Sequence, residues 1–117
     1  YIAHPADRHL FGIPAESPQQ VADTAKAMQD IGVDLIGLMT GMSYEGVEAG
    51  EIPDVVRKRL EALIKVTTVP TLAEGGINPV NFKAFIGTGV NILVVGTAFD
   101  DIARKAVTDT VKIFLER

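Results

Sequence analysis

Residues 69–79 read VPTLAEGGINP, and this stretch decides the fold class because it joins a strand to a helix through two glycines. The segment 69–73 is apolar and has the length of a buried strand. Gly75 and Gly76 permit a tight turn, Asn78 is a favoured helix cap, and Pro79 is favoured in a first helical turn. The stretch therefore predicts a strand, a turn and a short helix, which ends before Gly87.

The same order recurs on both sides of this stretch. Short apolar segments at 10–13, 33–39 and 90–95 predict three further strands. Residues 17–20 read SPQQ, which is a capping box, and they predict a helix over 18–31 that ends at Gly32. The chain is thus a series of strands, each followed by a helix.

Two later helices carry apolar stripes at helical spacing. The helix that follows Pro53 is expected to turn one stripe toward the core, made of Val56, Leu60 and Leu63. The last helix is expected from about residue 101, and its predicted buried face consists of Ile102, Ala106, Thr110, Ile113 and Phe114.

The alternation of strands and helices predicts an α/β fold with a parallel sheet, and four such units fit in the 117 residues as one domain. A complete (β/α)8 barrel needs roughly 200 residues or more. The 1–117 segment is therefore expected to form either half of a barrel or a small open, doubly wound sheet.

Composition excludes several classes of protein. Hydrophobic residues make up 47% of the chain, so a disordered chain is excluded, and the formal net charge of −4 disfavours binding to nucleic acid or an anionic membrane. The sequence has no cysteine and no apolar run near the roughly 20 residues of a membrane span. We expect a cytoplasmic domain and, because the chain starts at Tyr1 without Met, a piece of a longer protein.

Two glycine turns at the expected carboxyl ends of neighbouring strands are the candidate binding site. Gly75 and Gly76 follow one strand, and Gly96 and Thr97 follow the next. Glycine lets backbone N–H groups approach a ligand closely, and the helix behind each turn favours an anion. Ordinary tight turns are the alternative interpretation. We expect these four residues to bind phosphate.

Few side chains near this edge can carry out catalysis. All six lysines fall in or just after helical segments, which disfavours a Schiff-base mechanism. Glu74 is a candidate general base or a cap of its own turn. Glu45 is the other carboxylate near the mouth, and the two together are too few to hold a divalent metal without further ligands. His4 and His9 are expected at the surface or at a strand entry, and Tyr44 can cover a ligand or simply pack.

The segments 70–79 and 89–97, with the strands at 10–13 and 32–41, resemble the end of phosphate-binding barrels of the orotidine-monophosphate-decarboxylase-like group. Within that group the chain is most similar to 3-hexulose-6-phosphate synthase and 3-keto-L-gulonate-6-phosphate decarboxylase. The resemblance covers the chain from about Arg8 onward. It implies the C-terminal half of a TIM-type barrel with phosphate contacts at Gly75, Gly76, Gly96 and Thr97.

The resemblance also implies a function. Such enzymes are lyases, either aldolases or decarboxylases. They act on a phosphorylated sugar through an enediolate that a divalent metal, usually magnesium, stabilises. Their acid, lysine and metal ligands lie on the first half of the barrel, outside this segment. The isolated 117-residue chain is therefore expected to be inactive. We expect it to pair either with itself, as a homo-oligomer, or with a missing N-terminal half-barrel.

One part of the family's pattern is not kept. After their sixth strand these enzymes usually present a histidine, a glycine, an acid and a glutamine, and this chain has Met39, Gly41, Ser43 and Glu45 there. The alternatives are a phosphate-binding half-barrel without catalysis, or another phosphosugar barrel such as ribulose-phosphate 3-epimerase or thiamine-phosphate synthase. The missing aspartate and histidine pair at the strand ends disfavours the epimerase.

Overall fold

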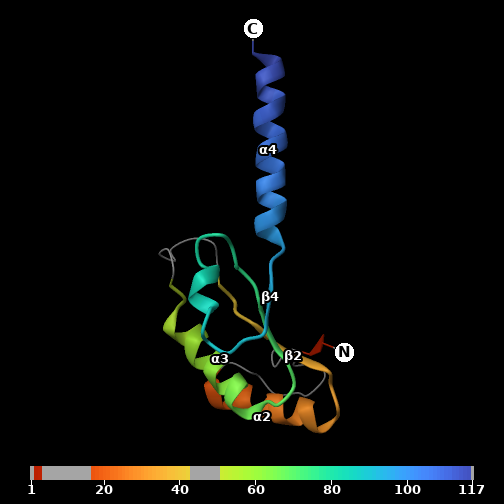
Figure 1. Ribbon diagram of the computed structural model, residues 1–117, viewed down its shortest axis with the longest axis vertical. Coiled ribbons are helices and arrows are strands. Elements are labelled where there is room, and N and C mark those ends of the chain that lie inside the picture. Colours follow the sequence, from red (N-terminus) through yellow and green to blue (C-terminus); the bar gives the residue numbers. More distant parts are fainter. Residues whose placement is uncertain (1, 4–16, 43–50, 117) are drawn as a thin grey trace.

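The computed structural model describes residues 2–3, 17–42 and 51–116 (Figure 1). The predicted strand at 10–13 lies outside these residues. The elements in chain order are β1 (Ile2–Ala3), α2 (Pro18–Asp30), β2 (Leu35–Met39), α3 (Asp54–Val66), β3 (Thr71–Glu74), the 3-10 helix η1 (Phe82–Phe85), β4 (Ile92–Val94) and α4 (Thr97–Leu115).

The strands form one parallel sheet in the order β1-β2-β3-β4. In its register Leu38 lies beside Ala73 and Ala73 beside Leu93, while Met39 lies beside Glu74. Each strand is thus a neighbour of the next one along the chain, and every pairing is parallel. The prediction of an α/β fold with a parallel sheet is confirmed.

The helix α2 begins where the capping box predicts. The Ser17 hydroxyl accepts a hydrogen bond from the Gln20 backbone N–H, and the Gln20 side chain accepts one from the Ser17 N–H. Pro18 occupies the first helical turn. The helix ends one residue earlier than predicted, so Ile31 is its exposed cap, and Gly32 follows with a φ of +87°.

The core lies between the sheet and the pair α2 and α3, which pack against each other at the bottom of Figure 1. Val56, Leu60 and Leu63 of α3 are almost fully buried, which confirms the predicted stripe. Leu60 and Leu63 belong to one hydrophobic cluster with Leu38 and Ala73, which lie side by side on one face of the sheet. Both helices therefore cover the same face of the sheet.

The segment after β3 differs from the prediction. Instead of a helix that starts at Pro79, the chain makes a turn and then the single 3-10 turn η1. The Asn78 side chain still caps, because its Oδ1 accepts the N–H groups of Val80 and Asn81. Phe85 is buried, whereas Ile86 is exposed.

The prediction for the last helix was wrong in two respects. The helix α4 starts at Thr97 rather than near residue 101, and it extends away from the rest of the molecule (Figure 1). Ala98 is its buried residue, and the face predicted to be buried is exposed throughout. The molecule consequently measures 63 × 26 × 22 Å. Among the described residues, no helix combines the length and apolar character needed to cross a bilayer.

Candidate functional site

The four glycine-turn residues line one cleft at the carboxyl edge of the sheet. Gly75 and Gly76 follow β3, Gly96 and Thr97 follow β4, and the cleft between them has a volume of about 230 Å³. Met39, Glu74 and Val94, the last residues of three neighbouring strands, also line it. The two turns that the sequence predicts as a pair are thus side by side.

The turn formed by Gly75 and Gly76, here called the glycine corner, is held in place by Thr40, which directly follows β2. The Thr40 hydroxyl donates to the Gly75 carbonyl, and the Thr40 N–H donates to the Glu74 carbonyl over 2.8 Å. Thr40 is buried, and its hydroxyl also accepts the Met42 N–H. Gly75 has a φ of +101°, where an added Cβ would lie 3.0 Å from the Thr40 Oγ1. The contact with Thr40 requires glycine at this position.

The second residue of that corner is held by a buried amide. The Asn81 Nδ2 donates to the Gly76 carbonyl over 2.8 Å, and its Oδ1 accepts the Asn78 N–H. Asn81 is 1% exposed, so the network is shielded from water. Gly76 has a φ of +67°, and an added Cβ would be 2.6 Å from the Met42 carbonyl oxygen. The carbonyl groups of the corner are therefore occupied by protein donors.

The backbone N–H groups of the two glycine turns differ from these carbonyl groups in their hydrogen bonding. Within residues 17–42 and 51–116, the N–H groups of Gly75, Gly76, Gly96 and Thr97 donate to no protein atom. Gly96 is the N-cap of α4 and has no side chain to cap it. The helix that starts here has 19 residues, so its partial positive charge lies at the cleft. Unpaired N–H groups and a helix N-terminus together favour an anionic ligand.

Glu74 brings a negative charge to the same cleft. It is half-buried at the end of β3, and its register partners are Met39 and Val94. A carboxylate disfavours a second anion close by. An anion in this cleft would therefore be disfavoured directly beside the Glu74 carboxylate.

Sequence reasoning missed Thr40 and Asn81, which fix the glycine corner. A signal for Asn81 exists, because Asn78 and Asn81 are separated by the three residues typical of a side chain that caps a turn. Thr40 follows a predicted strand directly, where a hydroxyl can bridge to the neighbouring strand end. Both are positioning residues for Gly75 and Gly76.

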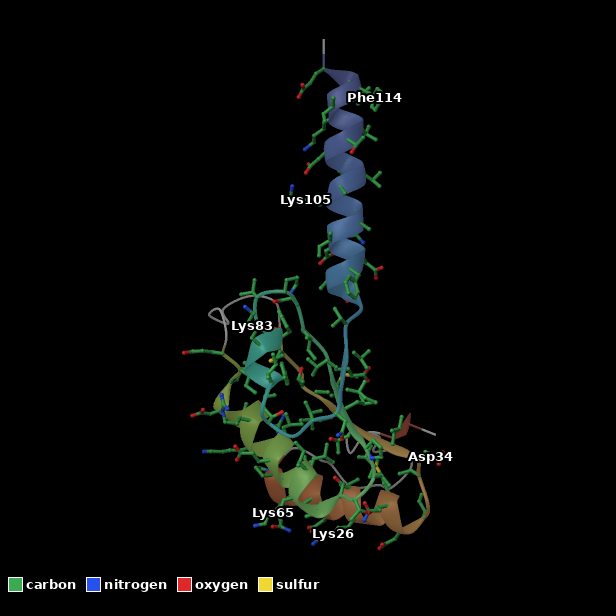
Figure 2. All side chains as sticks on the ribbon, in the orientation of Figure 1. Lys26, Asp34, Lys65, Lys83, Lys105 and Phe114 are labelled. Atoms are coloured by element: carbon green, nitrogen blue, oxygen red, sulfur yellow. The ribbon has the colours of Figure 1, made fainter. Side chains whose placement is uncertain are left out.

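The other predicted candidates do not join the cleft. All six lysines are exposed; Lys26 and Lys65 lie at the helix layer, and Lys105 lies on α4 (Figure 2). His4, His9, Ser43, Tyr44 and Glu45 lie outside the described residues. Met39 lines the cleft at the end of β2, and its thioether cannot transfer a proton.

Metal ligands are not gathered in the described part of the chain. There, no three His, Asp or Glu side chains come close enough together to hold an ion. Magnesium binding needs several oxygen ligands, and Glu74 alone does not provide them. The described residues do not fit a divalent metal.

Comparison with models of known protein families finds no match, and comparison with curated proteins finds none either. The geometry of the cleft is therefore the basis for a functional conclusion.

Proposed function

We propose that this chain binds the phosphate group of a phosphorylated sugar in the cleft between the ends of β3 and β4. The observation that carries the proposal is that Gly75, Gly76, Gly96 and Thr97 line a single cleft at the N-terminus of α4. Backbone N–H groups at such a place bind phosphate without any basic side chain. The net charge of −4 is therefore compatible with an anionic ligand.

The volume of the cleft suits a small chemical group rather than a whole metabolite. Sites for whole metabolites have volumes of about 300–1,000 Å³. The cleft has about 230 Å³, which suits a phosphate and the adjoining sugar carbon. The remaining sugar would extend past Glu74 toward the open face of the sheet.

For the architecture we propose the C-terminal half of a TIM-type barrel. Two observations favour it over an open doubly wound sheet. The strands follow one another in the order of the chain, whereas doubly wound sheets reverse their order. In addition, α2 and α3 cover one face only, and the other face exposes Met39, Ile92 and Val94. In a barrel that face would line the interior.

The corresponding activity is that of the phosphate-binding half of a lyase similar to 3-hexulose-6-phosphate synthase. The described residues do not fit the metal that such a reaction uses, so we assign no catalytic step to them. We expect the isolated chain to bind the phosphosugar without turning it over. This same observation favours the second candidate, a phosphate-binding half-barrel that catalyses nothing.

The test measures binding of inorganic phosphate and of a hexulose 6-phosphate by calorimetry. Gly96→Val is the informative variant, because no atom lies within 4 Å of the added Cβ and the φ of Gly96 is negative, at −123°. We expect it to weaken binding about tenfold by hindering the approach of phosphate to the N–H groups. Gly76→Val is unsuitable, since its Cβ would collide with Met42.

A second variant, Glu74→Gln, should change the affinity for phosphate in the opposite direction. Removing this negative charge should strengthen the binding of inorganic phosphate several-fold, because the carboxylate lines the same cleft. Glu61→Gln, on the exposed side of α3, removes the same charge elsewhere and should leave binding unchanged. Equal binding by wild type, Gly96→Val and Glu74→Gln would refute the proposal.

A further inference from the structure

The helix α4 has a face that the rest of the molecule does not cover. Its apolar residues recur at helical spacing, and Phe99, Ile102 and Phe114 are 63%, 53% and 83% exposed. Phe114 is near the free tip of the helix (Figure 2). We define the α4 stripe as the residues on this face: Phe99, Ile102, Ala103, Ala106, Thr110, Ile113 and Phe114.

The apolar face of α4 makes no packing contribution to the stability of the helix. Most of the stability of a helix in a protein comes from packing such a face rather than from the intrinsic propensity of its residues. Asp101 and Arg104 form an ion pair on the side of α4 away from the stripe, and Lys105 and Asp109 form another along one flank. Val107, Val111 and Leu115 are also exposed and lie outside the stripe, so the rest of α4 is mixed in character. The α4 stripe itself carries no charged residue, which makes it suited to burial.

The chain exposes more surface than a compact monomer of its mass. The accessible surface of the chain is 7358 Å², compared with about 6,200 Å² for a folded monomer of 12.5 kDa. Its radius of gyration of 17.1 Å also exceeds the about 13 Å of a compact chain of this length. The chain as a whole thus exposes about 1,200 Å² more than a compact monomer, compared with the roughly 800 Å² that each partner contributes to a standard interface.

We propose that the α4 stripe binds the α4 stripe of a second copy of this chain, with the two helices antiparallel. The stripe is nearly symmetric about its middle. Bulky residues stand at both ends, and the small residues Ala103, Ala106 and Thr110 lie between them. An antiparallel pair places Phe99 of one copy level with Phe114 of the other, and the small residues let the helix axes approach at the centre.

A pocket at the N-terminal end of α4 can accommodate the C-terminal end of the second copy's α4. Phe99 and Ile102 form an apolar corner with Phe82, Leu93 and Val95 of the body, and the corner has a volume of about 270 Å³. The α4 stripe continues into this corner. In the antiparallel pair Phe114 of the second copy reaches it, so each body would cover the tip of its partner's helix.

The charges beside the stripe favour the same direction. Lys105 and Asp109 lie on one flank of α4, where they form an ion pair with each other. In the antiparallel pair this flank meets the same flank of the second copy, and Lys105 comes within one residue's rise, about 1.5 Å along the axis, of the second copy's Asp109.

Sedimentation of the full chain over roughly a hundredfold range of concentration tests the pairing. We expect a reversible dimer. Ala106→Glu, at the centre of the stripe, should weaken dimerisation about tenfold or more, because it buries a charge. Thr108→Glu, on the far side of the same turn, should change it by less than about twofold. A chain that stays monomeric, or equal effects of the two variants, would overturn the proposal.

Cross-linking tests the direction, since the chain has no cysteine of its own. Ala106→Cys lies near the expected two-fold axis and should form a disulfide-linked dimer. Phe114→Cys alone should not, but a mixture of the Phe99→Cys and Phe114→Cys chains should give a mixed dimer. A disulfide between two Phe114→Cys chains would overturn the antiparallel arrangement. A dimer that survives Ala106→Glu would show that another surface pairs.

Discussion

The helices α3 and α4 have the same kind of sequence pattern but opposite surroundings. On α3 the apolar stripe is packed against the sheet and α2, and Leu63 is completely buried. On α4 an equally regular stripe faces solvent, and Ile113 is 67% exposed. The pattern of apolar residues thus determines which face of a helix is suited to burial, while the partner depends on what lies beside the helix in space.

The largest expected effect distinguishes the two helices directly. Leu63→Ala should lower the free energy of unfolding by about 2–5 kcal/mol, because it leaves a cavity in the core. Ile113→Ala should change it by less than about 0.5 kcal/mol at concentrations where the chain is monomeric. Urea titration of both variants measures this difference. Similar losses at low concentration would mean that α4 packs against its own body.

The next effect concerns the glycine corner. Gly76→Ala should lower the free energy of unfolding by about 2 kcal/mol or more, since it combines a positive φ with a collision with Met42. Gly87→Ala has a similar φ of +86° and no atom within 4 Å, so it should cost only about 1 kcal/mol. Thermal unfolding of the two variants compares them. Equal losses would show that the contact with Met42 is not tight.

A smaller effect is expected at the start of α2. Ser17→Ala removes the hydroxyl that accepts the Gln20 N–H and should cost about 1 kcal/mol. Gln19→Ala removes only an exposed hydrogen bond to Asp23 and should lower the free energy of unfolding by roughly a few tenths of a kcal/mol. Urea titration is the measurement. If both changes are neutral, the capping box does not determine where α2 begins.

The smallest expected effect is an increase in stability. Within the described residues, the buried Thr24 hydroxyl of α2 has no hydrogen-bond partner. Thr24→Val keeps the shape and should raise the free energy of unfolding by up to about 1 kcal/mol. Thr40→Val should lower it instead, because that hydroxyl bonds to Gly75 and Met42. A loss of stability in Thr24→Val would indicate that its hydroxyl does have a partner.

Local signals in the sequence predicted much of the body. Ser17 and Gln20 give the start of α2, and the spacing of Val56, Leu60 and Leu63 gives the buried face of α3. These signals are reliable because the interacting residues are close in sequence. The pairing of the two glycine turns also follows from the sequence, since parallel strands end at one edge of the sheet.

The remaining features depend on contacts between distant segments. Thr40 is 35 residues from the Gly75 carbonyl that it holds, so no local pattern reveals the bond. The early start of α4 at Thr97 is another case, because the helix was expected from about residue 101, one turn later. The exposure of the α4 stripe depends on the direction in which the chain leaves β4, which the residues of α4 do not encode.

Only Val95 and Gly96 connect β4 to α4, and this has a consequence for degradation. Arg104, Lys105 and Lys112 all lie on the exposed helix, so trypsin can reach cleavage sites there without unfolding the core. Digestion would trim α4 first and leave the sheet with α2 and α3. Pairing of the helices would protect the same bonds, and the lifetime of the intact chain in the presence of trypsin would then increase with its concentration.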